Sequence, residues 1–433
     1  MGKSTHSITP SKPVIRNEVI GGLTTFFTMA YIIVVNPSLL STPGTGITFQ
    51  GSLTATVLLA FSMTLLMGLY AKLPYAVAPG LGINAFFTFT VILGKKVPWP
   101  TALGMLFWAG VLFLLISITP IRTTIARGIP KSLRTGTVVG IGIFLSFIGL
   151  KGAGLVVGSP STLLTSGTIG TQSLLSLLGL GITVALMLKK SPFAFLAGIL
   201  FITLTSWGLG LVTLPQHWFS APDFHTVLFH LDILGALKLS LLPTIASFLF
   251  TDFFDSVSTF VGLSQAAGML DEDGQPLRLR EGLIVDALAT LFAGLLGTSS
   301  GTAYLESASG IEMGGKTGWT AVVTAFCFLP FLFLAPLAGM VPGFATAPVL
   351  ILIGALMFRN VTELPLERLE DVIPAFLTII LIPLTFSITQ GILWGFISHV
   401  VLYLLAGRRK EIRSIMYGLA GISIGLLLLE HHT

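Results

Sequence analysis

The sequence predicts an all-helical membrane protein that crosses the bilayer many times. Of its 433 residues, 53% are hydrophobic and only 9% are charged, whereas about 25% of the residues in soluble globular proteins are charged. Apolar stretches of about 20 residues, the length that crosses a bilayer as a helix, recur along almost the whole chain. The 48 glycines and 23 prolines fit helices that pack closely or break inside the membrane.

Fourteen spans are expected from the apolar stretches. The sequence does not decide whether a further apolar stretch, 414–429, lies along the membrane surface or crosses it; we place it along the surface. The expected spans lie near residues 18–40, 52–71, 76–94, 99–119, 132–152, 172–188, 192–213, 235–262, 280–297, 301–315, 318–340, 345–360, 370–386 and 388–407.

The distribution of lysine and arginine predicts the orientation, because these residues collect on the cytoplasmic side of a membrane protein. With the N-terminus and residues 408–413 in the cytoplasm, 19 of the 23 basic residues lie inside and four lie outside. We therefore expect a multi-pass protein of the cytoplasmic (inner) membrane with the lipid bilayer as its environment. The basic residues flank spans, so the net charge of +5 does not indicate nucleic-acid binding. No cleaved signal is predicted.

Two segments do not resemble ordinary membrane helices. Residues 75–84, YAVAPGLGIN, carry Pro79 between small residues, and residues 297–304, GTSSGTAY, are small and polar up to the tyrosine. Each is expected to be an extended piece that leads into a half-helix, as in secondary transporters. A faint repeat is also visible, because TTFFTM from Thr24 and TDFFDS from Thr251 are separated by about as many residues as the two broken segments are. Chance similarity between apolar segments is the alternative explanation of this match. Seven spans in each half would make the second copy inverted.

Three acidic residues lie deep in apolar segments, namely Asp252, Asp255 and Glu306. A carboxylate inside a bilayer costs several kcal/mol unless it faces a cavity or a partner, so such residues indicate function. Asp252 and Asp255 are three apart and share a helix face. Repulsion and desolvation both favour the neutral acid, so we expect one of them to exchange protons. The alternative is that either aspartate caps a helix break or binds nearby backbone.

Glu306 follows the second broken segment and should lie in the first turn of its half-helix. There it could accept hydrogen bonds from the N–H groups of a heterocycle, or it could only stabilise the helix N-terminus. Asn84 holds the matching place in the first segment and could bind substrate or join the two half-helices. Tyr304 and Phe87 could stack on a planar ligand, although ordinary packing is the alternative for any single phenylalanine.

Other acids are expected to be solvated. Asp286 and Glu312 are placed nearer the cytoplasmic ends of their spans, where water reaches them; the alternative for Asp286 is that it closes a cytoplasmic gate. The single cysteine, Cys327, has no partner for a disulfide within the chain. No Walker motif, CxxC, HExxH or GxSxG is found, so the machinery of ATP-driven transport and of several enzyme classes is lacking. We expect no enzyme, no cofactor and no metal site.

Three long segments in consistent order carry a resemblance to a known family. They are APGLGINAFFTF (78–89), TDFFDSVSTFVG (251–262) and GTSSGTAYLESASGIEMGGKTG (297–318), preceded by EVIGGLTTFFTMAYIIVVNP (18–37). Together they resemble the AzgA-like adenine/guanine/hypoxanthine permeases of the nucleobase cation symporter family. One departure is Ser258, where the family more often has glycine, and this puts fine specificity in doubt.

The resemblance implies fourteen transmembrane segments in two inverted seven-span repeats, with spans 3 and 10 part strand and part half-helix. It implies a core of residues 18–119 and 235–340 and a gate of 120–213 and 345–407, between an N-terminal tail, 1–17, and a cytoplasmic or interfacial end, 408–433. It also implies proton-coupled uptake of purines, with Asp255 and Glu306 as substrate-binding carboxylates, Asp252 and Asn84 at further important polar positions, and homodimers as in the wider family.

The buried carboxylates and the resemblance together favour purine uptake coupled to H⁺, with Asp252, Asp255 and Glu306 as the groups that handle the proton. An anion carrier on the same scaffold is the alternative, because half-helix N-termini attract anions, but three carboxylates would cancel that attraction. An intramembrane aspartyl protease would need its two aspartates on separate helices and a GxGD motif. A passive channel would show flux without accumulation.

Overall fold

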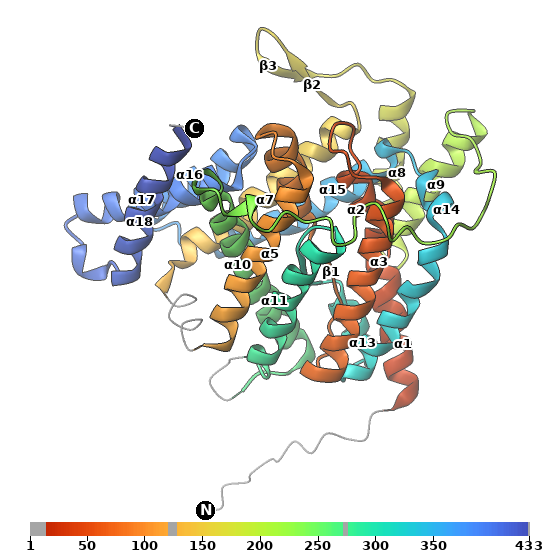
Figure 1. Cartoon of the computed structure of the whole chain (residues 1–433), viewed down its shortest axis with the longest axis horizontal. Coiled ribbons are helices and arrows are strands. Elements are labelled where there is room, and N and C mark those ends of the chain that lie inside the picture. Colours follow the sequence, from red (N-terminus) through yellow and green to blue (C-terminus); the bar gives the residue numbers. More distant parts are fainter. Residues whose placement is uncertain (1–13, 120–127, 272–275, 432–433) are drawn as a thin grey trace, which may run out of the picture.

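The computed structural model describes residues 14–119, 128–271 and 276–431 (Figure 1). The elements of the first half are α1 (Ile15–Met29), α2 (Ile32–Leu40), α3 (Phe49–Leu66), η1 (Met67–Ala71), β1 (Val77–Pro79), α4 (Leu81–Ala85), η2 (Phe86–Gly94), α5 (Trp99–Ile118), α7 (Lys131–Gly152), β2 (Val156–Ser159), β3 (Leu163–Ser166), α8 (Thr171–Leu188) and α9 (Ala194–Gly208).

The elements of the second half are η3 (Gly235–Leu237), η4 (Leu239–Leu241), α10 (Leu242–Ala267), α11 (Leu279–Leu296), β4 (Gly301–Ala303), α12 (Ser307–Glu312), α13 (Gly318–Phe328), η5 (Leu329–Phe333), α14 (Ala335–Gly339), α15 (Gly343–Phe358), η6 (Arg359–Glu363), α16 (Leu369–Thr385), α17 (Ile388–Leu405), η7 (Arg409–Glu411) and α18 (Ser414–His431).

Helices account for the apolar stretches, as predicted. Within the described residues, seven helical segments are long and apolar enough to cross a membrane by length and composition alone: Ile15–Leu40, Phe49–Ala71, Trp99–Ile118, Lys131–Gly152, Thr171–Leu188, Gly343–Glu363 and Ile388–Leu405. Four further apolar helices are shorter. Some of the remaining expected spans are interrupted, and these interruptions position the polar residues described below.

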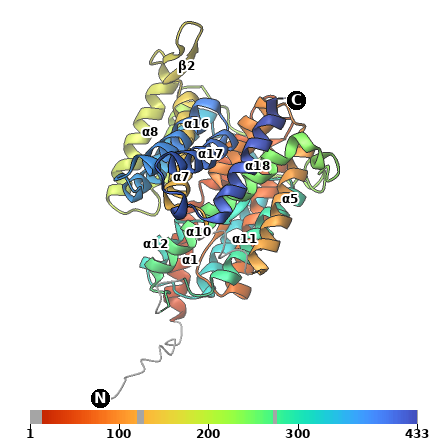
Figure 2. The same cartoon turned by 90° about the vertical axis from the view of Figure 1, so that its left-hand side faces the viewer.

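The helices pack into two bundles. The first bundle joins α1 to α12 and α13, α3 to α11 and α13, and α5 to α10 and α11. The second bundle joins α7 to α15, α16 and α17, and α8 to α9 and α15. Figure 2 shows the second bundle beside the first, with α8 and the β2–β3 hairpin at its outer end. Each bundle therefore takes helices from both halves of the chain.

The two halves are inverted relative to each other. We call the face of the molecule where α1 begins the α1 face. The carboxylate of Glu18, near the start of α1, accepts hydrogen bonds from the backbone N–H groups of Lys316 and Thr317 before α13. On the opposite face, Lys95 Nζ after η2 lies 3.1 Å from the hydroxyl of Thr244 at the start of α10. The first helices of the two halves thus begin at opposite faces.

The two broken segments meet as a pair of antiparallel strands. Val77 pairs with Ala303 and Pro79 with Gly301, as expected for spans 3 and 10. The pairing extends beyond the strands, because Tyr304 N donates to Ala76 O at 2.9 Å and Gly80 N donates to Ser300 O at 2.8 Å. All six strand residues are buried. Backbone groups that would otherwise be unpaired inside the molecule are satisfied between the two halves.

Glycine permits the closest helix contact near this junction. Gly21 of α1 faces Gly310 of α12, and a Cβ built on Gly21 would lie 2.8 Å from the carbonyl oxygen of Gly310. A Cβ built on Gly310 would collide with the carbonyl oxygen of Gly21 and the hydroxyl of Thr25. The half-helix α12 is therefore held against α1 at backbone distance.

The C-terminal helix corrects one expectation. We expected residues 414–429 to lie along the membrane surface, but α18 runs back along α17 and contacts α10 and η4, which lie at the face opposite the α1 face. Both views show its C-terminal end on the side opposite the beginning of α1 (Figures 1 and 2). Met416, Ala420, Ser423 and Leu427 form its buried face. The regular i, i+4, i+7 spacing of this face favours packing on α17.

We predict that Gly310→Ala lowers the free energy of unfolding by about 1–3 kcal/mol, because the added methyl group has no space beside Gly21. The measurement is the midpoint of thermal unfolding of the purified protein in detergent. Gly418→Ala in α18 is the matched control, because nothing lies within 4 Å of a Cβ there. Equal midpoints for the two variants would contradict the close helix contact.

Candidate functional site

Interrupted helices place a carboxylate and a tyrosine together at the centre of the first bundle. Span 1 breaks at Ala30 and Tyr31, between α1 and α2. Glu306 follows β4 and lies directly before α12. The hydroxyl of Tyr31 donates a hydrogen bond to Oε1 of Glu306. The structure therefore confirms the predicted location of Glu306 at the N-terminus of a half-helix.

Asp255 and Glu306 form the accessible carboxylate pair of the site. Both side chains are half-buried, and their charges are close enough to interact. They come from α10 and from the start of α12, two helices that pack against each other. Two carboxylates that face the same space can accept hydrogen bonds from N–H donors of a ligand.

Asp252 and Asp286 form a second, fully buried pair. Asp252 accepts hydrogen bonds from the hydroxyls of Thr290 and Ser300, the latter at 2.8 Å. Asp286 accepts them from Ser256 and from Thr302 at 3.2 Å. One carboxylate oxygen of each aspartate has no hydrogen-bond partner. The two aspartates of α10, although three residues apart, therefore belong to different pairs.

The buried position of Asp286 corrects the expectation that water reaches it. Its side chain is fully buried on α11, between α10 and the strand β4. The position of Asp286 along its span did not predict its exposure to water, because β4 and α10 cover this part of α11. Glu18 is also buried, although it begins a span, because it binds the segment before α13.

Asn84 lies in a buried hydrogen-bond network. Its amide nitrogen donates to Oδ1 of Asn36 at 2.6 Å, and its oxygen accepts a hydrogen bond from Ser299. Asn36 in turn donates to Thr56 and Thr298, at 2.7 and 2.9 Å. Both polar atoms of Asn84 are used in this way. The geometry favours the alternative in which Asn84 joins the two broken segments.

The two aromatic candidates lie away from open space. Phe87 is fully buried, and its ring centroid lies 6.4 Å from that of Phe248. Tyr304 is buried, and its hydroxyl donates to the carbonyl oxygen of Pro79. The small neighbours of Tyr304 do not leave its ring exposed, because the paired strand fills that space. Tyr304 nevertheless lies close enough to Asp255 and Glu306 for the charged groups to interact.

Sequence reasoning missed three residues of this region: Tyr31, Asn36 and Asp286. Asn36 lies beside Pro37 in an otherwise apolar helix, and a buried amide in such a helix is a usable signal. Asp286 had the same signal, but we assigned it to the solvated end of its span. Tyr31 had no signal of its own, because only the break at Ala30 and Tyr31 turns it toward Glu306.

The exposure of α10 differs on the two sides of Asp255. On α10, Ser258, Gly262 and Gln265 are exposed and follow the face that carries Asp255. On the same face of the helix, but N-terminal to Asp255, the side chains of Thr244, Ser247 and Thr251 are buried. Leu305, the neighbour of Glu306, is 54% exposed. Polar residues on this face of α10 are therefore exposed between Asp255 and the α1 face and buried on the other side of Asp255.

The two bundles touch at the opposite face. There the hydroxyl of Thr90 in η2 donates to the carbonyl oxygen of Phe386, which follows α16. Phe386 has a φ of 52° and packs its ring against Phe144 and Phe147 of α7. This contact closes the interface between the bundles on that side. The bundles also meet where Phe27 of α1 packs against Phe193 and where Tyr31 packs against Phe195 of α9, with ring centroids 4.8 and 4.9 Å apart.

No group of three or more metal-ligating side chains is found among the described residues. The chemistry available to the site is therefore that of carboxylates, hydroxyls, amides and backbone groups. These groups can bind a polar heterocycle and a proton.

Comparison with known proteins identifies the family. Residues 16–393 match the model of a permease family, the xanthine/uracil permeases. The chain belongs to this family. The permease is 45% identical over 407 residues to a permease of Methanocaldococcus jannaschii, covering 94% of this chain and 93% of the relative. It is 41% identical to the adenine permease AdeP of Escherichia coli, covering 92% and 89%. It is 39% identical to the guanine/hypoxanthine permease PbuG of Bacillus subtilis, covering 93% and 94%.

Solved structures show the same fold at low sequence identity. The transmembrane domain of the cyanobacterial bicarbonate transporter BicA has a TM-score of 0.66 at 16% identity and covers 88% of the permease and 97% of that chain. SLC26A9 has a TM-score of 0.62 at 11% identity, covering 91% and 66%. The permease is therefore a multi-pass membrane protein with the inverted-repeat fold of these transporters.

We predict that a cysteine at position 258 reacts with a hydrophilic maleimide, whereas a cysteine at position 247 does not. Both positions lie on the face of α10 that carries Asp255, but Ser258 is exposed and Ser247 is 2% exposed. The variants Ser258→Cys and Ser247→Cys are made in a Cys327→Ser background and labelled as purified protein in detergent. Equal labelling at the two positions would contradict this difference in exposure along α10.

Proposed function

We propose that the permease takes up purine nucleobases together with protons by alternating access. The support is its relationship to adenine and guanine/hypoxanthine permeases over more than 90% of its length, combined with a polar site between two bundles. The first bundle is the core, which carries the substrate, and the second bundle is the gate against which the core moves. The half-buried pair of Asp255 and Glu306 carries this proposal.

The ligand would be recognised by complementary hydrogen bonds. Asp255 and Glu306 accept hydrogen bonds from the N–H groups of the purine. The first backbone N–H groups of α4, which no side chain caps, could donate to its ring acceptors. A ligand that lacks these donors would leave buried carboxylates unpaired, which costs more than the lost bond alone. The site would therefore discriminate by the donor pattern of the ring.

A proton would be held by the buried pair of Asp252 and Asp286. These carboxyl groups are close, and neither is exposed to solvent. Two neighbouring carboxylates without solvent repel each other, so one of them is expected to be neutral. Asp252 lies one turn from Asp255 on α10 and bonds to Ser300 beside β4, so its protonation could be sensed by the substrate site. We assign the coupling proton to Asp252.

The α1 face is the cytoplasmic face of the inner membrane in this proposal, because lysine and arginine are concentrated there. The exposed end of α10 then faces the cytoplasm, where the purine would be released. Anion transport, which the half-helix N-termini alone would permit, is disfavoured by the negative charge of Asp255 and Glu306.

We predict that accumulation of labelled adenine, guanine or hypoxanthine by cells or proteoliposomes collapses when the proton gradient is dissipated. Asp252→Asn should exchange labelled for unlabelled purine but should not accumulate it, because the side chain can no longer bind and release a proton. Accumulation that is unchanged without a proton gradient, or by Asp252→Asn with one, would remove the proposed coupling.

Glu306→Gln is expected to weaken purine uptake about 10- to 100-fold, since one hydrogen bond to a charged group contributes about 1.5–3 kcal/mol. The matched control is Glu312→Gln, because Glu312 lies on the same short helix and is exposed. Competition by a panel of purines and pyrimidines against one labelled base measures specificity. If Glu306→Gln keeps the affinity of the control, Glu306 does not bind the purine.

A further inference from the structure

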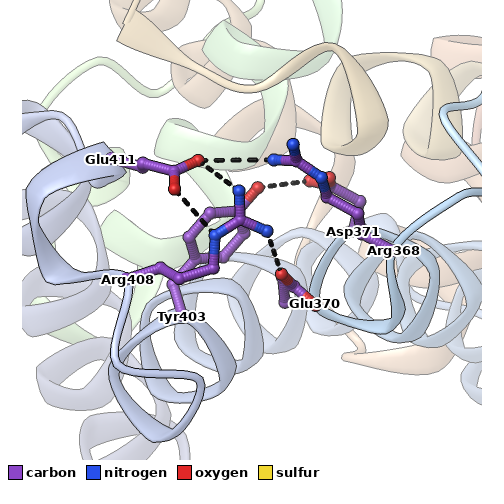
Figure 3. Close-up of polar contacts among 6 residues, drawn as sticks. All are labelled: Arg368, Glu370, Asp371, Tyr403, Arg408 and Glu411. Atoms are coloured by element: carbon purple, nitrogen blue, oxygen red, sulfur yellow. Dashed lines mark hydrogen bonds and ion pairs between the residues drawn. The ribbon is translucent and has the colours of Figure 1, made fainter.

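Two groups of arginines at the α1 face of the second bundle differ in their partners. Those of the first group are neutralised by acids. Arg408 binds Glu370, and its Nε and Nη2 bind Glu411 at 2.7 Å each (Figure 3). Arg368 reaches the same Glu411 at 3.3 Å. The Arg408 guanidinium holds the pKa of the Glu411 carboxyl below its usual value. This cluster ties the start of α16 to the turn that precedes α18.

Arg134 and Arg413 form the second group, and acids do not neutralise them. Arg134 lies in the first turn of α7, and Arg413 directly precedes α18. Their positive charges are close enough to repel each other. Nε of Arg134 is buried and forms no hydrogen bond. Among the described residues, neither guanidinium has a recorded ion pair, whereas nearby Lys131 is paired with Glu363 at 3.2 Å.

The beginnings of two long helices converge at this pair. A Cβ added to Gly128, just before α7, would lie 2.5 Å from Cγ2 of Ile415 in the first turn of α18. No side chain caps the N-terminus of α7, which follows Pro130. The hydroxyl of Ser132 in its first turn is buried and also lacks a partner. Uncapped N–H groups and two guanidinium groups together create a strongly positive site.

We propose that Arg134 and Arg413 bind the phosphate of an anionic phospholipid headgroup at the α1 face. A phosphate would accept hydrogen bonds from both guanidinium groups and remove their repulsion. A lipid is favoured over free phosphate because the site lies at the membrane end of α7 and α18. The adjacent outer surface of α18 exposes Tyr417 and Ile422, which suit contact with acyl chains. This site is separate from the purine site and does not depend on it.

The test is thermal unfolding of the full-length protein in detergent, titrated with short-chain phosphatidylglycerol, short-chain phosphatidylcholine or inorganic phosphate. Phosphatidylglycerol is expected to raise the unfolding midpoint of the wild type, and phosphatidylcholine is not. Arg134→Gln and Arg413→Gln should each increase the concentration for half-maximal stabilisation about tenfold or more, because each removes a charge-assisted hydrogen bond. Lys410→Gln, an exposed cation nearby, should behave as the wild type.

Three outcomes would overturn the proposal. Equal stabilisation by phosphatidylcholine would show that the headgroup charge is not recognised. Stabilisation by inorganic phosphate at the same concentration as phosphatidylglycerol would identify a free-anion site instead of a lipid site. Equal effects of Lys410→Gln and Arg413→Gln would indicate nonspecific attraction. Because Arg413 is exposed, Arg413→Gln keeps the test valid even if Arg134→Gln fails to fold.

Discussion

The pairing of β1 with β4 is the constraint on which the rest of the structure depends. Inside a membrane, backbone N–H and C=O groups need partners from the protein itself. Two interrupted spans, one from each half of the chain, supply these partners to each other. The remaining edges are covered by side chains: Thr64 exchanges hydrogen bonds with the backbone of Val77, both at 2.9 Å. Neither half could bury its broken segment alone.

This dependence explains where the polar residues are. Thr290 and Ser300 beside β4 bind each other at 2.8 Å and both bind Asp252. Asn36, Asn84 and Thr298 connect span 1 to both broken segments. Each of these side chains forms a hydrogen bond either with an interrupted segment or with another side chain that does. The acids can remain in the interior because the hydroxyls required by an interrupted backbone also serve as their donors.

Much of this arrangement could be predicted from the sequence. Small and polar residues around Pro79 and Ser300 are incompatible with a lipid-facing helix, and a carboxylate such as Glu306 has few tolerable positions in a membrane. These are strong local constraints. The partners of Asp252 could not be predicted, because residues three apart on a helix can face different neighbours, and the neighbours belong to other spans. Tyr31 and the path of α18 were likewise decided by tertiary packing, for which the local sequence carries no pattern.

The hydrogen bond between Tyr31 and Glu306 has a consequence for binding strength. The carboxylate already accepts one hydrogen bond when no ligand is bound, so a purine that binds Glu306 as proposed would share the carboxylate with Tyr31 or displace the tyrosine. A purine that displaces Tyr31 would gain only the small difference between two similar bonds. Such a displacement would give moderate affinity together with fast release, and in the unloaded protein Tyr31 partly compensates the half-buried charge.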